Sequence, residues 1–337
     1  MAALRPLLLA LGLLLVVAPS AAQAVELVGA IHEHSGYSDG KPGTRPADYY
    51  AAGRANGLDY VIGTEHAENL PFPGTLNEGC LSPAVAGCVV ADSVEPSNAL
   101  RKWGAAAEQA TAASDAAFTG LRGFEWTSDR SGHLGVLFSR NTTLAYADGG
   151  NVTVDAFWSW FTRPASAGGG GDALAIFNHP GSKGLDESDP AYNWQDFAHE
   201  PAADARMIGM EVFNGGGDDG SDGPPEGWYA RALDRGWHVG AVGAEDSHDD
   251  GWARPDRPKT VIDAASRAPA DIRAALLARR FYATAQHGLR MTFTVDGAPM
   301  GSRLRRAAGS PLQVRATATA PGTTIELLTS GGKVVAT

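Results

Sequence analysis

The sequence has no cluster of basic residues and no long apolar stretch beyond its first 24 residues. Its 337 residues carry a formal net charge of -11. A chain this acidic is poorly suited to binding long nucleic acid, whose phosphates attract lysine and arginine. Because no later stretch is apolar enough to cross a bilayer, we expect no membrane span in the mature protein.

The first 24 residues are typical of a signal peptide. Arg5 precedes an apolar core at 7–17, and Pro19 precedes the small-residue site AQA at 22–24. The core has about eleven residues, too few for the alternative, a membrane-spanning anchor. We therefore expect cleavage after Ala24 and a secreted or periplasmic bacterial protein. Losing the positive charge of Arg5 changes the net charge from -11 to -12.

Cysteine is nearly absent. Cys80 and Cys88 share the loop NEGCLSPAVAGC, and no histidine lies close enough in the sequence to complete a zinc knuckle with them. In an oxidising compartment we expect a small disulfide between them; the alternative is two free thiols. The two cysteines are not placed for catalysis. We therefore expect catalysis without a protein nucleophile.

Short apolar runs alternate with helical patterns between residues 25 and 289. The apolar runs do not alternate with polar residues, as expected of parallel strands covered on both faces. Repeated strand–helix units predict an α/β barrel. The expected strands cover 25–31, 58–64, 118–126, 134–139, 173–177, 207–213 and 237–243, and the expected helices cover 45–57, 96–117, 154–162 and 225–236.

The pattern changes near residue 290. From there on, short segments alternate apolar with polar residues and are interrupted by glycine and proline. This predicts a small antiparallel, sandwich-like β module. The pattern stops within a strand, so we expect a module that is incomplete or continues in a longer protein. The predicted domains are the signal peptide 1–24, the barrel 25–289 and the β module 290–337.

A dense group of ionisable residues follows the first predicted strand, in IHEHSGYSDG. His32 and His34 are two residues apart, so in an extended strand they project to the same side. The SGYSDG segment then turns the chain, which allows Asp39 to fold back toward them. Taken alone, this group is also compatible with an ordinary loop.

Further histidines and carboxylates follow other predicted strands, and six of the nine histidines lie at strand ends. Because the C-terminal ends of parallel barrel strands meet on one face, we expect these side chains to converge there. Imidazole and carboxylate ligands together suit zinc, manganese or iron. The additional residues are His66 after 58–64, Glu125 and His133 between 118 and 139, His179 after 173–177, and Asp246 and His248 after 237–243.

Taken in order, HEHSGYSDG, GTEH, GFEW…GH, NHPG and GAEDSH resemble the motifs of the PHP (polymerase and histidinol phosphatase) superfamily. The stretches GMEVFNGG and RPKTVIDA…DIRAALLARRFYAT are similar to secreted members of the CehA/McbA type. The resemblance covers residues 27–300. It implies a distorted (β/α)7 TIM-like barrel that holds two to three divalent ions, either zinc, manganese or iron.

The resemblance also implies roles for individual residues. Asp246 is then both a metal ligand and a catalytic residue. The superfamily usually has Thr-Asp-His where this chain has Thr-Glu-His, so Glu65 acts either in acid–base chemistry or by orienting a ligand histidine. The implied metal ligands are His32, His34, Asp39, His66, Glu125, His133, His179, Asp246 and His248.

Three functions are compatible with these motifs. The leading hypothesis is an exported hydrolase in which a metal-bridged hydroxide cleaves a phosphomonoester or phosphodiester of a small molecule or nucleotide. Phosphate requires cationic partners, and Lys41, Arg130 and Lys183 lie beside the motifs. The alternatives are a carboxylic or carbamate ester hydrolase of the CehA/McbA type and a non-catalytic, metal-stabilised binding module.

Overall fold

The computed structural model describes the chain from Ala24 to Thr337 with several gaps. The described residues are 24–70, 75–76, 89–90, 99–147, 150–181, 186, 188–215, 225–285, 288–319, 322 and 324–337. The predicted signal peptide, both cysteines and Lys183 lie outside them, so export and the disulfide stay predictions. In the described part of the chain, no helix combines the length and apolarity that crossing a bilayer requires.

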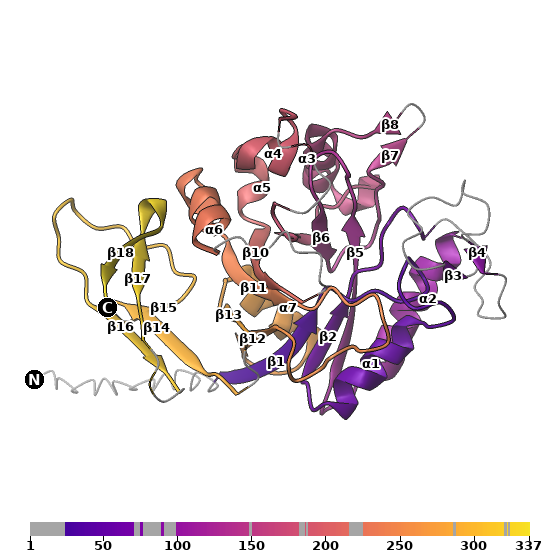
Figure 1. The fold of residues 1–337 in the computed structure, drawn as a ribbon, viewed down its shortest axis with the longest axis horizontal. Helices are drawn as coiled ribbons and strands as arrows, with labels where there is room; N and C mark the ends of the chain where they lie inside the picture. Colours follow the sequence, from indigo (N-terminus) through magenta and orange to yellow (C-terminus); the bar gives the residue numbers. More distant parts are fainter. Residues whose placement is uncertain are drawn as a thin grey trace, which may run out of the picture.

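A mixed sheet of nine strands forms the body of the molecule (Figure 1). Its strand order is β11-β10-β9-β6-β5-β2-β1-β12-β13. The pairs β1–β2, β2–β5, β9–β10 and β10–β11 are parallel, as the apolar runs predicted. The strands are β1 (Val25–Ile31), β2 (Tyr60–Gly63), β5 (Thr119–Trp126), β6 (Leu134–Leu137), β9 (Leu174–Phe177), β10 (Met207–Asn214), β11 (Gly240–Ala244), β12 (Lys259–Ala264) and β13 (Phe281–Thr284).

The sheet curls until its two ends meet, which produces a nearly closed barrel. β12 and β13 contact β11 at the far end of the order. The Thr260 hydroxyl on β12 donates to the Gly243 carbonyl at 2.9 Å and accepts from the Gly243 amide at 3.0 Å. The α/β barrel is therefore confirmed, although its sheet has nine strands rather than the expected seven.

Four strand pairings depart from an all-parallel barrel. β6 runs antiparallel to β5 and β9, because the connection over residues 127–133 is too short for a crossover helix. β12 runs antiparallel to β1 and to β13. These last two strands arise from the RPKTVIDA…FYAT stretch, and they close the barrel.

Helices surround the sheet, and most pack against it through aromatic or aliphatic side chains (Figure 1). The predicted helix at 154–162 is confirmed, and its Phe157, Trp158, Trp160 and Phe161 are buried against the barrel. The helices are α1 (Pro46–Ala55), α2 (Ala99–Ala113), α3 (Val154–Thr162), α4 (Tyr192–Phe197), α5 (Pro201–Asp204), α6 (Pro225–Asp234) and α7 (Pro269–Leu277), with 3-10 turns η1 (Ala165–Ala167) and η2 (Ser330–Gly332).

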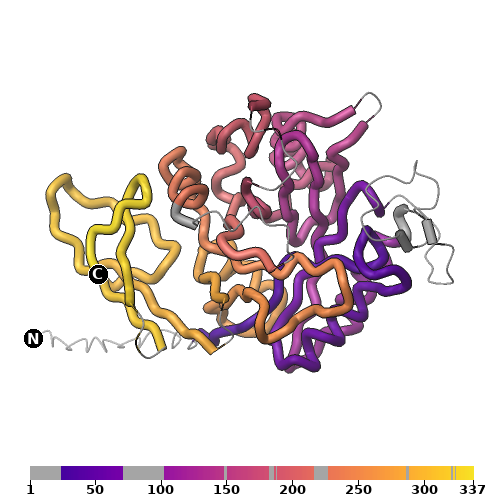
Figure 2. The backbone as a smooth tube through the Cα atoms, in the orientation of Figure 1, coloured from indigo at the N-terminus to yellow at the C-terminus, as the bar shows by residue number. Residues whose placement is uncertain are grey.

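Beyond residue 290 the chain forms small antiparallel sheets at one side of the barrel, in yellow in Figure 2. Asp234 at the end of α6 anchors them by accepting from the Ser330 hydroxyl at 2.6 Å and from the Gly331 amide at 2.7 Å. The small strands of the chain are β3 (Thr75–Leu76), β4 (Val89–Val90), β7 (Tyr146–Ala147), β8 (Gly150–Asn151), β14 (Met291–Val295), β15 (Ala298–Pro299), β16 (Val314–Ala318), β17 (Leu327–Thr329) and β18 (Lys333–Ala336).

Candidate metal centre

The C-terminal ends of the parallel strands carry the predicted ligands. Backbone pairing continues past these ends, since Glu33 forms a parallel bridge with Ser247 and His66 forms one with Glu125. The segments that bear the ligands are therefore fixed to one another before any side chain interacts. All nine predicted ligands come together on this face.

Glu125 lies at the centre of one half of the group. Its Oε1 atom is 3.2 Å from His32 Nε2, 3.3 Å from His133 Nδ1 and 3.2 Å from His179 Nε2. His32 Nε2 is also 3.3 Å from Asp246 Oδ1. Glu125 is fully buried, so its charge acts on these imidazoles without screening by solvent.

Asp39 organises the other half. Its Oδ1 atom is 3.2 Å from His66 Nε2 and 3.3 Å from His248 Nε2. The His34 ring stacks against both of these imidazoles, with centroid distances of 4.4 Å and 4.3 Å. His34 Nε2 lies 3.2 Å from Asp246 Oδ1, which joins the two halves.

The spacing and chemistry of these side chains fit clustered divalent ions. Ligands about 2.1 Å from one ion lie roughly 3.0–3.4 Å from each other, the separation found here between nitrogen and oxygen. The buried atoms His34 Nε2, Asp39 Oδ1 and His133 Nδ1 lack a hydrogen bond to any described residue, and a bound ion would satisfy them. The overlapping ligand sets are His34–Asp39–His66–His248, His32–His34–Glu125, His32–His179–Asp246 and Glu125–His133–His179.

Three of the ligands have left-handed backbone conformations. The φ angle is 72° at His32, 24° at His179 and 50° at Asp246. Such conformations cost on the order of 1–3 kcal/mol each in non-glycine residues and persist only where the surroundings enforce them. Their concentration at one face of the barrel is typical of a functional centre.

The carboxylates and imidazoles of the centre shift one another's pKa values. Burial alone would raise the pKa values of Asp39, Glu125 and Asp246, but the neighbouring imidazoles hold all three well below their usual range. Burial would likewise lower the pKa values of His32 and His66, but the carboxylates raise both well above their usual value. Without metal, the centre is thus a network of compensating charges.

Proton release should accompany metal binding. Burial and the neighbouring imidazoles lower the pKa of His34 to about 3, so this ligand is already neutral. Burial acts in the same direction on His133 and His248, but the charges of Glu125 and Asp39 outweigh it and raise both pKa values to about 9. A ligand imidazole must be neutral, so metal uptake at pH 7 should displace at least about two protons.

Isothermal titration of Zn²⁺ or Mn²⁺ into chelator-treated protein, in buffers of different ionisation enthalpy, measures this release. The number of protons released should fall as the pH rises through 9, because His133 and His248 then lose their protons before the metal binds. Equal proton release at pH 7 and well above pH 9 would contradict the assignment of these two imidazoles as ligands.

Glu65 lies behind the ligands rather than among them. Its carboxylate accepts hydrogen bonds from the Ser35 amide at 3.0 Å, the Ser35 hydroxyl at 2.5 Å and the Ser38 hydroxyl at 2.5 Å. Ser38 Oγ is 3.3 Å from His34 Nδ1, the ring nitrogen opposite the one that faces the other ligands. This geometry favours the orienting role for Glu65 over the acid–base role.

Several supporting residues did not emerge from the sequence. The fully buried Glu211 on β10 accepts a hydrogen bond from His32 Nδ1 at 2.7 Å. The Asn178 amide donates to Glu125 Oε1 at 2.7 Å, and Thr127 Oγ1 is 2.5 Å from His66 Nδ1. The signal for Glu211 was present as a lone carboxylate within the apolar strand MIGMEVF, since a buried charge requires a partner.

Lys41 and Arg130 each pair with an aspartate that is not among the predicted ligands, and the roles of the predicted cationic residues in substrate binding stay predictions. Lys41 Nζ is half exposed and lies 3.3 Å from Asp250. Arg130 is held by Asp189 through its Nε and Nη2 atoms, at 2.7 Å and 3.2 Å. Lys183 falls outside the described residues.

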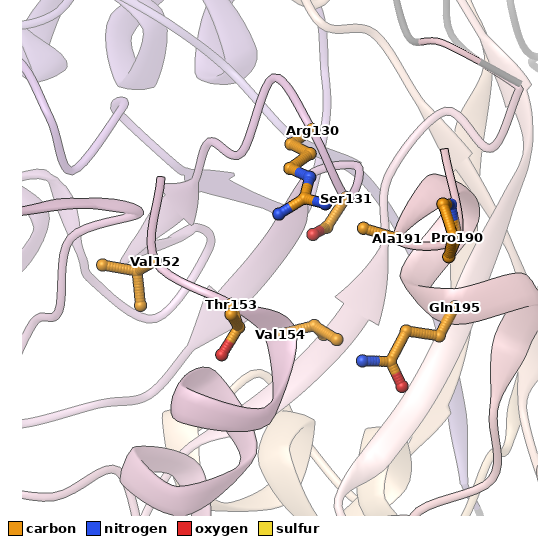
Figure 3. Close-up of a pocket in the computed structure, with 8 residues that line it drawn as sticks. All are labelled: Arg130, Ser131, Val152, Thr153, Val154, Pro190, Ala191 and Gln195. Atoms are coloured by element: carbon orange, nitrogen blue, oxygen red, sulfur yellow. The ribbon is translucent and has the colours of Figure 1, made fainter. Parts of the chain in front are cut away.

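A cavity of about 390 Å³ opens beside the loop that carries His133 (Figure 3). Arg130 and Ser131 line it from this loop, two to three residues before the ligand, and Gln195 lines it from α4. Val154 at the start of α3 contributes an apolar wall. The cavity therefore combines hydrogen-bonding groups with apolar surface, and its link to the centre is the loop that leads to His133.

No protein-family model matches the sequence, and no curated protein matches it. Solved structures do resemble it. A two-domain protein from Bacteroides vulgatus that contains a predicted PHP-like metal-dependent phosphoesterase is 22% identical, with a TM-score of 0.51, over 80% of this chain and 67% of its own. This likeness shows that the two proteins share a fold.

Two further structures are more distant. PsfC from Pseudomonas syringae is 12% identical, with a TM-score of 0.44, over 77% of this chain and 91% of its own. The lesion-specific endonuclease PfuEndoQ from Pyrococcus furiosus is 13% identical, with a TM-score of 0.42, over 77% of this chain and 58% of its own.

Proposed function

We propose that this protein is a metal-dependent hydrolase of phosphoesters. The convergence of nine predicted ligands into overlapping sets around Glu125 and Asp246 carries the proposal. Overlapping sets place more than one ion within reach of a single tetrahedral group, an arrangement suited to phosphoryl chemistry. The PHP-like fold supports it as analogy only.

The protein's own residues contribute charge and orientation. Divalent ions bound here would supply Lewis acidity and activate water near neutral pH. His32, His133 and His179 would hold one end of the ion cluster, with Glu125 shared between sets, and His66 and His248 would hold the other. The low pKa values of Glu125 and Asp39 keep these two carboxylates ionised, and burial shields the group from bulk water.

The cavity beside His133 is suited to the alcohol half of the ester. Arg130 and Gln195 offer hydrogen bonds, and Pro190, Ala191 and Val154 offer apolar contact. Because Asp189 already compensates the charge of Arg130, a polar but neutral ring fits better than a second anion. The proposed substrates are therefore phosphoesters of small hydroxylated or heterocyclic alcohols.

A panel of aryl phosphomonoesters, aryl phosphodiesters and carboxylic esters, with Mn²⁺ or Zn²⁺ added after chelator treatment, tests the proposal. Phosphoester turnover should be metal-dependent and at least about tenfold faster than carboxylic ester turnover. Preference for carboxylic esters would assign the CehA/McbA-type activity instead. Metal binding without turnover of any ester would favour the non-catalytic, metal-stabilised binding module.

The same panel tests the cavity. Ala191→Trp fills the cavity. It should raise KM several-fold for phosphoesters of bulky alcohols and leave KM for methyl phosphoesters unchanged. Ala198→Trp, an exposed position just beyond α4, is the matched control. Equal effects of Ala191→Trp on bulky and minimal substrates would show that the cavity takes no part in substrate recognition.

A further inference from the structure

Glu211 is a buried charge inside an otherwise apolar strand, and all of its hydrogen bonds among the described residues serve one set of ligands. Its Oε1 atom accepts from His32 Nδ1 at 2.7 Å. Its Oε2 atom accepts from the His179 backbone amide at 2.7 Å and from the Asn214 side-chain amide at 3.0 Å. The same Asn214 amide donates to Asp246 Oδ2 at 3.1 Å.

The first contact fixes the tautomer of His32. A carboxylate only accepts hydrogen bonds, so His32 carries its proton on Nδ1 and leaves Nε2 free as a ligand atom. That Nε2 atom is the one that faces Glu125 at 3.2 Å and Asp246 at 3.3 Å. The carboxylate also increases the basicity of the ring, which strengthens a metal bond.

The other contacts fix two more ligands. His179 has φ 24°, and the bond from its amide to Glu211 holds this unfavourable backbone in place. Asn214 connects Glu211 to the carboxylate of Asp246. One side chain on β10 thereby reaches ligands that follow three other strands, β1, β9 and β11.

These three ligands make up one complete set, His32–His179–Asp246. The set around Asp39 has different support, because His66 Nδ1 contacts Thr127, and His34 Nδ1 contacts Ser38, which is bonded to Glu65. We infer that Glu211 is the positioning residue for the metal ion held by His32, His179 and Asp246, the set in which all three ligands depend on it. Glu65 supports His34, which belongs to other sets.

Glutamine at this position tests the inference. Glu211 accepts three hydrogen bonds, and in Glu211→Gln the new amide group would place a donor against the donors of His179 and Asn214. The variant should bind one equivalent of metal fewer than the unsubstituted protein, or bind that ion at least about tenfold more weakly. Metal content by mass spectrometry and Co²⁺ absorption titrations measure both quantities.

A double substitution shows which ion is affected. His66→Ala removes a ligand of the Asp39 set and should cost one equivalent by itself. If Glu211 serves another ion, the combination of Glu211→Gln and His66→Ala loses two equivalents. If the combination loses no more than His66→Ala, or if Glu211→Gln keeps all metal with unchanged affinity, the inference is overturned.

A milder variant covers the case in which Glu211→Gln does not fold. Asn214→Ala removes the relay between Glu211 and Asp246 and should weaken the same ion several-fold while leaving the folded structure intact by circular dichroism. Unchanged affinity in Asn214→Ala would then overturn the inference. Metal occupancy does not depend on which ester is cleaved. The metal measurements therefore test the role of Glu211 independently of the proposed phosphoesterase activity.

Discussion

Replacing Glu125 by glutamine should reduce kcat/KM on the order of a thousandfold or more, beyond the 10–100-fold typical of groups outside the ligand shell. Glu125 belongs to two ligand sets and lies within 3.3 Å of four imidazoles. Glutamine keeps the shape of the side chain but loses the negative charge that two neighbouring ions would share. Both metal content and turnover should therefore fall.

The measurement combines steady-state kinetics with metal analysis of the purified variant. Glu108→Gln on the exposed face of α2 makes the same chemical change away from the centre and should leave both readouts unaltered. If Glu125→Gln retained more than about a tenth of its activity at full metal content, the proposed centre would not be the site of hydrolysis.

The second large effect concerns Glu65→Gln. Since Glu65 acts on His34 through Ser38, the substitution should lower metal affinity and kcat/KM by about 10–100-fold. Its carboxylate oxygens are occupied by Ser35 and Ser38, so it is not positioned to donate a proton to a leaving group. The shape of the pH profile should therefore remain unchanged, even though burial raises the pKa of Glu65.

A control variant and the pH profile together separate the roles of Glu65. Ser38→Ala breaks the link to His34 and should reproduce part of the loss. A Glu65→Gln protein that keeps its metal but loses one limb of the pH profile, mainly with poor leaving groups, would show that Glu65 is the proton donor. Full activity together with full metal would exclude both roles.

The sequence was sufficient to predict which imidazoles and carboxylates come together at one face of the barrel. His32, His34 and the later motif residues each follow an apolar run, and parallel strands in a barrel bring their C-terminal ends to one face. This inference depends only on the pattern of apolar and polar residues along the chain and on the chemistry of the residue types. It requires no knowledge of the exact register between strands.

The remaining features depend on contacts between residues far apart in the chain. Glu211 and His32 are separated by 179 positions, and nothing local to either residue indicates a hydrogen bond between them. The same holds for barrel closure, because the contact of β12 and β13 with β11 depends on how far the whole sheet curls. Arg130 looked like a free cation in the sequence, but the fold brings Asp189 to it.

The sequence by itself thus determined which imidazoles and carboxylates meet at one face of the barrel, because residue type and strand-end position are local properties. Tertiary structure alone decided which carboxylates support them: Glu65 turned toward the serines behind His34, and Glu211 reached the ligands of three other strands. Burial is the physical reason for this difference. A buried carboxylate must find donors wherever the packed fold supplies them, and the positions of those donors are set by the packing of the entire barrel.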